Sequence, residues 1–150
     1  MEYIKIENEF DCKCADKLLN ELIKYESNLD DVINGECIIN DFHKDMINHS
    51  HVFAYYVKED DECIGYIFAY LKTPLNDIIT TNVVMLESLF VKEKYRKKGL
   101  GKKLIEMLEE WAKSKWDKYV VEIVCLSDNK NALNFYKKLG YVESKTILRK

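Results

Sequence analysis

The chain has 150 residues, of which 47% are hydrophobic and 33% charged, and its formal net charge is −3. This size and composition predict one domain, 1–150, with a substantial core. The acidity argues against a nucleic-acid partner, no apolar run reaches the length of a membrane span, and the N-terminus lacks the apolar stretch of a signal peptide.

The cysteines and histidines suggest no metal site. The five cysteines are an odd number, and Cys12 and Cys14 are too close in sequence for an ordinary zinc half-site. His49 and His51 could form a metal pair, but exposed histidines at a helix end are the simpler interpretation. We therefore expect free thiols, no metal and a cytoplasmic protein.

The first half of the chain predicts a strand, two helices and a hairpin of two strands. Residues 1–7 alternate as a strand, and Asp11 can cap a helix that runs to about Tyr25. A polar loop over 28–36 precedes a shorter helix over about 39–49. Residues 51–58 and 63–72 read as two strands, and the acidic residues 59–62 join them as a hairpin. The loop over 73–82 is long enough to be functional.

A strand, a turn and a helix follow one another from residue 83 to 116. Residues 83–91 are almost all apolar apart from Glu87, which is typical of a central strand buried on both faces. The helix that starts at Leu100 has its apolar residues on one face: Leu100, Leu104, Ile105, Leu108, Trp111 and Ala112.

The turn between them is strongly cationic. From Lys92 to Lys103 there are seven cations and one anion, so this segment carries +6 and the rest of the chain −9. Gly99 and Gly101 permit unusual backbone angles and close approach of a ligand. Because the first N–H groups of a helix lack internal partners and mark its positive end, the turn predicts a phosphate-binding site. A solvated charge run is the alternative.

The C-terminal part predicts a strand over 119–126, a helix and a last strand over 141–149. Asn129 lies in the segment that can cap the helix, and Gly140 stands where a left-handed cap is expected. The resulting order, β-α-α-β-β-β-α-β-α-β, predicts an α/β fold in which helices flank a mixed central sheet.

Two motifs resemble a known family. Neither of the common nucleotide-binding glycine motifs fits. Leu104 stands where the third glycine of G-x-G-x-x-G would be, and the pattern G-x-x-x-x-G-K-[ST] is also absent. Arg96-x-x-Gly99-x-Gly101, between its strand and helix, resembles the signature of the GCN5-related N-acetyltransferase (GNAT) superfamily. The segment from Asn129 to Tyr141 is similar to that family's N-x-x-A-x-x-x-Y-x-x-x-G-[FY] pattern, with Tyr136 at the tyrosine.

The resemblance implies an enzyme that uses acetyl-coenzyme A as co-substrate, and a sheet that opens beside the central strand. The pantetheine arm would contact Leu89 and Val91 on that strand, and Asn129. The residues implied for cofactor binding are Leu89, Phe90, Val91, Arg96, Lys97, Lys98, Gly99, Leu100, Gly101, Lys102 and Asn129.

The resemblance also implies the catalytic groups. Tyr136 would protonate the leaving thiolate, and Glu87 would accept a proton from the amine, directly or through water. Burial of Glu87 in the strand would raise its pKa and make it a better base. The structural alternatives are a core aromatic for Tyr136 and a carboxylate paired with a cation for Glu87. Cys125 is a candidate acyl acceptor, but a small buried hydrophobic residue is the better interpretation.

The acceptor is less well defined. Residues 21–26, 86–91 and 134–140 resemble the diamine and polyamine acetyltransferase branch, and the acidic remainder of the chain suits such a substrate, although that branch's C-terminal extension is missing. A polyamine-like amine is therefore the first expectation. A protein N-terminus or lysine, an amino acid, an aminoglycoside and a non-catalytic acyl-CoA-binding module stay open. A homodimer is the default expectation in this superfamily.

Overall fold

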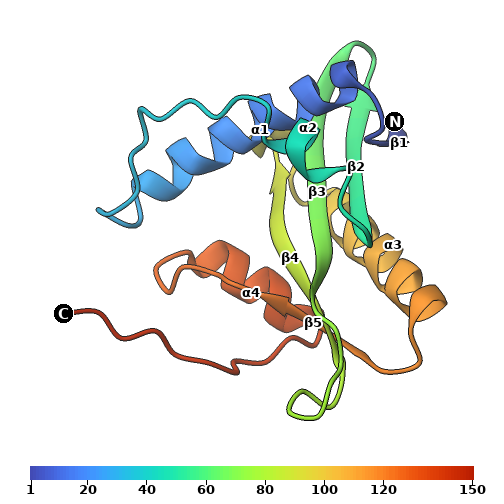
Figure 1. Ribbon diagram of the computed structural model, residues 1–150. Coiled ribbons are helices and arrows are strands. Elements are labelled where there is room, and N and C mark those ends of the chain that lie inside the picture. The colour runs from blue at the N-terminus through green and yellow to red at the C-terminus, as the bar shows by residue number, and fades with distance from the viewer.

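A mixed sheet forms the centre of the molecule, as the sequence predicts, and it has five strands. The computed structural model describes residues 1–150 (Figure 1). The strands lie in the order of the chain, which is β1 (Glu2–Lys5), β2 (Val52–Glu59), β3 (Glu62–Thr73), β4 (Asn82–Val91) and β5 (Tyr119–Ile123). Neighbours from β1 to β4 are antiparallel, and β5 runs parallel to β4. The hairpin between β2 and β3 turns at Asp60, which takes the left-handed conformation.

Helices cover both faces of this sheet. Helix α1 (Glu9–Ser27) and the short α2 (Phe42–Met46) lie on one face, and α3 (Leu100–Lys115) lies on the other (Figure 1). Helix α4 (Lys130–Lys138) packs on the side of α3, because Phe135 contacts the core cluster of that face. A single turn of 3-10 helix, Glu93–Tyr95, joins β4 to the loop before α3.

The core has two parts, one on each face of the sheet. The α3 face buries aliphatic side chains of β2, β3 and β4 under Leu104, Ile105 and Leu108. The α1 face buries larger and more polar groups, including Tyr56, Tyr66 and Phe68. Each fully buried aliphatic or aromatic side chain stabilises the fold by about 1.5–3 kcal/mol. The two clusters therefore fix both helical layers on the sheet.

The start of α1 differs from the prediction. Asn8, and not Asp11, is the N-cap: its side chain accepts a hydrogen bond from the Asp11 amide at 2.9 Å. Asp11 is the third helical residue and accepts in return from the Asn8 amide at 3.3 Å, which completes a capping box. Both residues are good caps, and only the reciprocal geometry shows which of them precedes the helix. Helix α2 is also shorter than the predicted 39–49.

The predicted last strand over 141–149 is wrong. The chain after Gly140 pairs with no strand, and Val142, Ile147 and Leu148 are 85%, 77% and 90% exposed. The segment is instead held by three ion pairs, Glu143 with Lys137 on α4, Lys145 with Glu122 on β5 and Arg149 with Asp30 in the loop after α1. Exposed ion pairs contribute at most about 1 kcal/mol each, so they hold the segment only weakly. Because the segment pairs with no strand, the sheet ends at β5.

Two other observations bear on the sequence-based expectations. The cysteines are free thiols, and Cys12 and Cys14 are buried in α1. None of the helices is both long enough and apolar enough to cross a membrane.

Candidate active site

The sheet opens between β4 and β5. These strands pair from Asn82 with Tyr119 to Leu86 with Ile123, and the pairing then stops. Strand β4 continues for five more residues to Val91 and stays paired only with β3. Glu87 stands at a bulge, because Ser88 pairs with Phe68 and Leu86 pairs with Ala69, which leaves Glu87 without an opposite residue.

The free edge of β4 presents backbone groups to this opening. The Lys92 amide donates to Ile64 in β3, at 2.9 Å. Since amide directions alternate along a strand, the amides of Leu89 and Val91 point away from β3 and toward the opening. The Val91 carbonyl on this side accepts a hydrogen bond from Arg96 Nε at 2.7 Å. Leu89 and Val91 are the two strand residues that the family resemblance implies as contacts of the pantetheine arm.

A loop of unpartnered amides follows. The backbone angle φ is 60° at Lys97 and 85° at Gly99, so both residues are in the left-handed region. The Arg96 amide donates to Glu93 and the Lys103 amide to Gly99, but the amides from Lys97 to Lys102 have no acceptor in the protein. They lie at the positive end of α3, which has no side-chain cap. The arrangement can bind a diphosphate through the backbone.

The side chains of this loop have a different role from its backbone amides, because they contact other parts of the protein. The Arg96 guanidinium lies 5.5 Å from the ring centre of Tyr25 and 5.6 Å from that of Phe90, so it braces the loop against α1 and β4. Glu62 binds Lys92 and Lys94 at 3.0 and 3.1 Å, and these lysines lower the pKa of Glu62 to about 2. The positive charge of the segment is therefore partly neutralised within the protein.

Helix α4 places Tyr136 beside the opening. Asn129 is the N-cap: its side-chain oxygen accepts from the Ala132 amide at 3.2 Å. Gly140, with φ of 93°, ends the helix as predicted. The half-buried Tyr136 has no hydrogen-bond partner in the protein, and burial, followed by the proximity of Cys125, raises the pKa of its phenol. It is therefore protonated at neutral pH and can act as a proton donor.

The two halves of the site are in direct contact. A Cβ atom at Gly101 would come within 3.1 Å of the Phe135 ring, so the absence of a side chain lets α4 pack against the first turn of α3. Gly99 has open space around it and is required for its backbone angle instead. Tyr136 follows Phe135 in the chain, so the position of the phenol depends on the same contact that holds the amide loop.

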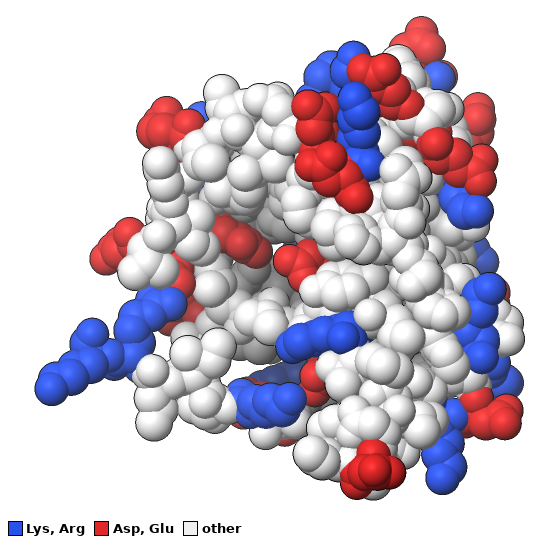
Figure 2. All heavy atoms as spheres, in the orientation of Figure 1, with Lys and Arg blue, Asp and Glu red and all other residues white.

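A narrow cleft of about 50 Å³ brings the predicted residues together. Glu87, Leu89, Asn129 and Tyr136 all line it, together with Cys125 and with Leu22 and Glu26 from α1. Phe90 does not: its side chain is buried in the α1-face core. Figure 2 shows a hollow between α1 and α4 with acidic side chains in its walls.

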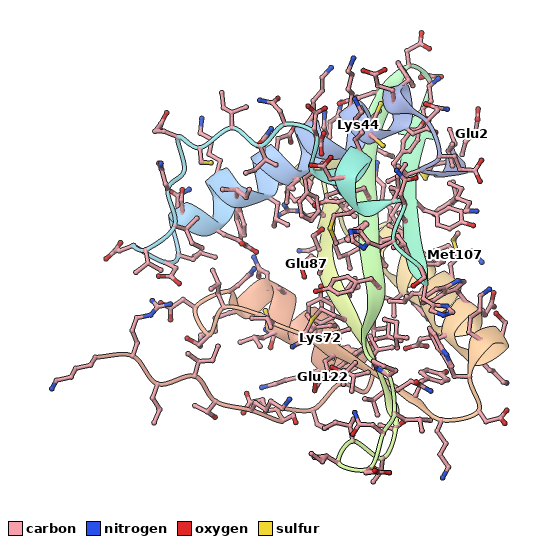
Figure 3. All side chains as sticks on the ribbon, viewed as in Figure 1. Glu2, Lys44, Lys72, Glu87, Met107 and Glu122 are labelled. Carbon is pink, nitrogen blue, oxygen red and sulfur yellow. The ribbon has the colours of Figure 1, made fainter.

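The expected burial of Glu87 is wrong. Its side chain is exposed and projects from the middle of β4 between α1 and α4 (Figure 3). Its carboxylate accepts one long hydrogen bond, 3.5 Å from the Tyr70 hydroxyl, and it has no cation partner. The bulge and the end of the β5 pairing place this side chain at the open cleft, where it is accessible to water.

Glu26 also lines the cleft, and the sequence predicted no role for it. It lies four residues after Leu22 and eight after Leu18, on the stripe of α1 that otherwise carries apolar residues. A carboxylate at an apolar position of a helix was the available signal. Burial raises the pKa of Glu26.

The comparisons with known proteins agree with this geometry. The model of the acetyltransferase (GNAT) family matches residues 16–141. The chain belongs to the GNAT acetyltransferase family. This GNAT protein is 32% identical, over 88 residues, to an uncharacterised N-acetyltransferase encoded in the pepI 3′ region of Lactobacillus delbrueckii subsp. lactis. That match covers 59% of the chain and 50% of the relative, so the chain spans half the length of that protein.

Solved structures support the GNAT fold over the whole chain. A tetramutant of the BH1408 protein from Bacillus halodurans superposes with a TM-score of 0.85 at 19% identity, covering 99% of this chain and 98% of the other. An aminoglycoside N-acetyltransferase, AAC(6')-Iy in complex with CoA, superposes with a TM-score of 0.74 at 17% identity, covering 99% and 97%. At these identities the likeness establishes the fold.

Proposed function

We propose that the protein is an N-acetyltransferase that moves an acetyl group from acetyl-coenzyme A to a primary amine by direct attack. Membership of the GNAT family supports the reaction class. The single observation that carries the proposal is a path of unpartnered amides in two stretches, Leu89 and Val91 on the free edge of β4 and Lys97 to Lys102 at the start of α3. The protonated Tyr136 lies beside the first stretch.

Each part of this path has a matching part of the co-substrate. The amides of Leu89 and Val91 would bind the pantetheine arm as an added strand, and the side-chain NH₂ group of Asn129, which has no partner in the protein, would contact the same arm. The loop from Arg96 to Lys102 would hold the diphosphate through the free amides of Lys97 to Lys102. Arg96 acts there by bracing the loop through its own side chain.

The reaction needs three proton transfers, one new bond and one broken bond. The protonated amine gives a proton to Glu87, directly or through water, and its nitrogen then bonds to the acetyl carbonyl carbon. The Leu89 amide stabilises the charge that builds on the carbonyl oxygen. As the carbon–sulfur bond breaks, Tyr136 donates its proton to the leaving thiolate, and the new amide nitrogen returns its surplus proton to the Tyr136 oxygen, directly or through water. Because Glu87 is exposed, it can pass its proton to solvent after each turnover.

A small polyamine-like amine is the first acceptor that we propose. The segment from Lys92 to Lys103 carries +6 and the remainder of the chain −9, and the cleft is lined by Glu26 and Glu87 without a lysine or arginine. An aminoglycoside is a second candidate, since AAC(6')-Iy, an aminoglycoside N-acetyltransferase, shares the fold. A homodimer also stays a proposal, which light scattering would test.

The test combines co-substrate binding with turnover. Millimolar acetyl-coenzyme A is expected to raise the melting temperature, since a ligand that binds the native state stabilises it. Thiol release is then followed over a panel of diamines, polyamines, aminoglycosides, amino acids and peptides, with mass detection of the acetylated product. A melting shift without release on any amine would favour a non-catalytic acyl-CoA-binding module, and the absence of a shift would remove the acetyl-coenzyme A assignment.

A further inference from the structure

Glu26 is a half-buried carboxylate that has no partner in the protein. It lies in the last turn of α1 and lines the cleft opposite α4, in the same cavity as Glu87 and Tyr136. Its side chain takes part in none of the ion pairs or hydrogen bonds of the structure, whereas the Glu62 side chain near the other end of the site binds two lysines. Burial is the cause of its raised pKa, and no cation offsets it.

An unpartnered carboxylate in this position weakens the free protein. Removing a charge from water disfavours its ionised form unless a partner compensates. A leucine or methionine at position 26 would continue the apolar stripe of Leu18 and Leu22 and pack against the same wall. The cleft therefore keeps a charge where the fold alone would favour an apolar residue.

A second carboxylate in the cleft also lacks a cation partner. Glu87 lines the same cavity, and its one side-chain hydrogen bond is the long one from the Tyr70 hydroxyl. Glu26 and Glu87 are both able to accept hydrogen bonds, and no lysine or arginine lines the cleft to donate them. An ammonium group brings a positive charge and three donors. The lining of the cleft is complementary to more than one such group.

We infer that Glu26 is a specificity-determining residue that binds a second ammonium group of the acceptor. Glu87 holds the amine that attacks, and Glu26 holds another amine of the same molecule. This inference rests on the proposed function and narrows its substrate class to small acceptors with at least two amines. Polyamines and aminoglycosides share this chemistry.

The test compares acceptors that differ only in the second amine. Wild type and Glu26→Gln are assayed by thiol release with 1,4-diaminobutane and with n-butylamine at saturating acetyl-coenzyme A. We expect Glu26→Gln to lower kcat/KM for the diamine at least tenfold, chiefly through KM, and to change it less than twofold for the monoamine. Spermidine and neamine are run in parallel, and the acceptor with the larger Glu26→Gln effect identifies the source of the second amine.

Two controls separate recognition from structure. Glu110→Gln removes an exposed charge of α3 that has no ion-pair partner, and it is expected to leave kcat/KM unchanged for all four acceptors. The melting temperature of Glu26→Gln is expected to equal or exceed that of wild type, because the unpartnered charge is gone. Glu26→Asp keeps the charge on a shorter side chain and is expected to retain part of the preference for the diamine.

Three results would overturn the inference. They are an equal loss on diamine and monoamine, an unchanged diamine kcat/KM, and a melting temperature of Glu26→Gln clearly below that of wild type. Each of these leaves acetyl-coenzyme A binding and thiol release intact in wild type. Failure of the proposed function is different and would be visible first, because wild type would then release no thiol with any amine.

Discussion

Tyr136→Phe removes one hydroxyl group and tests whether this phenol is a catalytic acid or part of the core. The hydroxyl has no partner in the protein, so its loss breaks no hydrogen bond. Burial raises the pKa of the phenol above its usual value near 10. At neutral pH the group is fully protonated, and the proton is available to a thiolate in the cleft.

The two interpretations predict different magnitudes. A hydrogen bond made within the protein contributes about 0.5–1.5 kcal/mol to stability. Since none is lost here, the free energy of unfolding is expected to change by less than about 0.5 kcal/mol. A positioned general acid contributes about 10²–10⁴ in rate, so turnover is expected to fall by about a hundredfold or more, which is about 2.7 kcal/mol in the activation barrier.

Three measurements on each variant decide between them: kcat from thiol release at saturating amine, the Kd of acetyl-coenzyme A by calorimetry, and the urea unfolding curve. Tyr141→Phe is the matched control. Its ring lies 5.8 Å from that of Tyr136, but its hydroxyl donates to Glu109 at 3.4 Å, outside the cleft. Turnover of Tyr136→Phe within threefold of wild type, or an equal loss in Tyr141→Phe, would refute the assignment.

Three further changes test other groups. Glu87→Gln is expected to slow thiol release mainly at low pH, where fewer acceptor molecules are already neutral, and an unaltered pH–rate profile would remove Glu87 as the base. Asp16→Ala leaves three donors of Asp41 and His43 without their acceptor, so urea unfolding should show a loss of about 3 kcal/mol or more; a loss below 1 kcal/mol would contradict this. Burial lowers the pKa of His43, so below pH ~6.5 the unfolded chain binds a proton at this histidine more readily than the folded protein does. The free energy of unfolding should therefore fall by up to about 1.4 kcal/mol for each pH unit of acidification. A flat curve of stability between pH 5 and 7 would show that His43 does not contribute to the pH dependence.

The parts of the site that depend on local signals were predicted well. The strand before the turn was expected over 83–91 and is observed at Asn82–Val91, and the helix begins at Leu100 as expected. Gly99 and Gly140 have the positive φ angles that their places in the sequence suggested. Each of these features is decided by a residue and its neighbours within one or two turns of chain.

The errors concern contacts between distant segments. A strand over 141–149 needs a partner edge, and β5, five residues long, does not pair with it. The exposure of Glu87 depends on where β5 leaves β4, which no residue near Glu87 reports. The role of Glu26 depends on α1 lying across the cleft from α4. Sequence periodicity describes one element at a time, so it identified these segments without placing them against each other.

The opening between β4 and β5 follows from a difference in length. Strand β4 has ten residues and β5 has five, so half of β4 has no neighbour on that side. Six residues, 124–129, connect β5 to α4, and the last of them, Asn129, caps the helix. The pairing of β5 with β4 ends at Ile123, immediately before this connection, and α4 starts immediately after it. Because the connection is short, the helix that carries Tyr136 begins close to the free edge of β4, which is why the free strand edge and the phenol occur together.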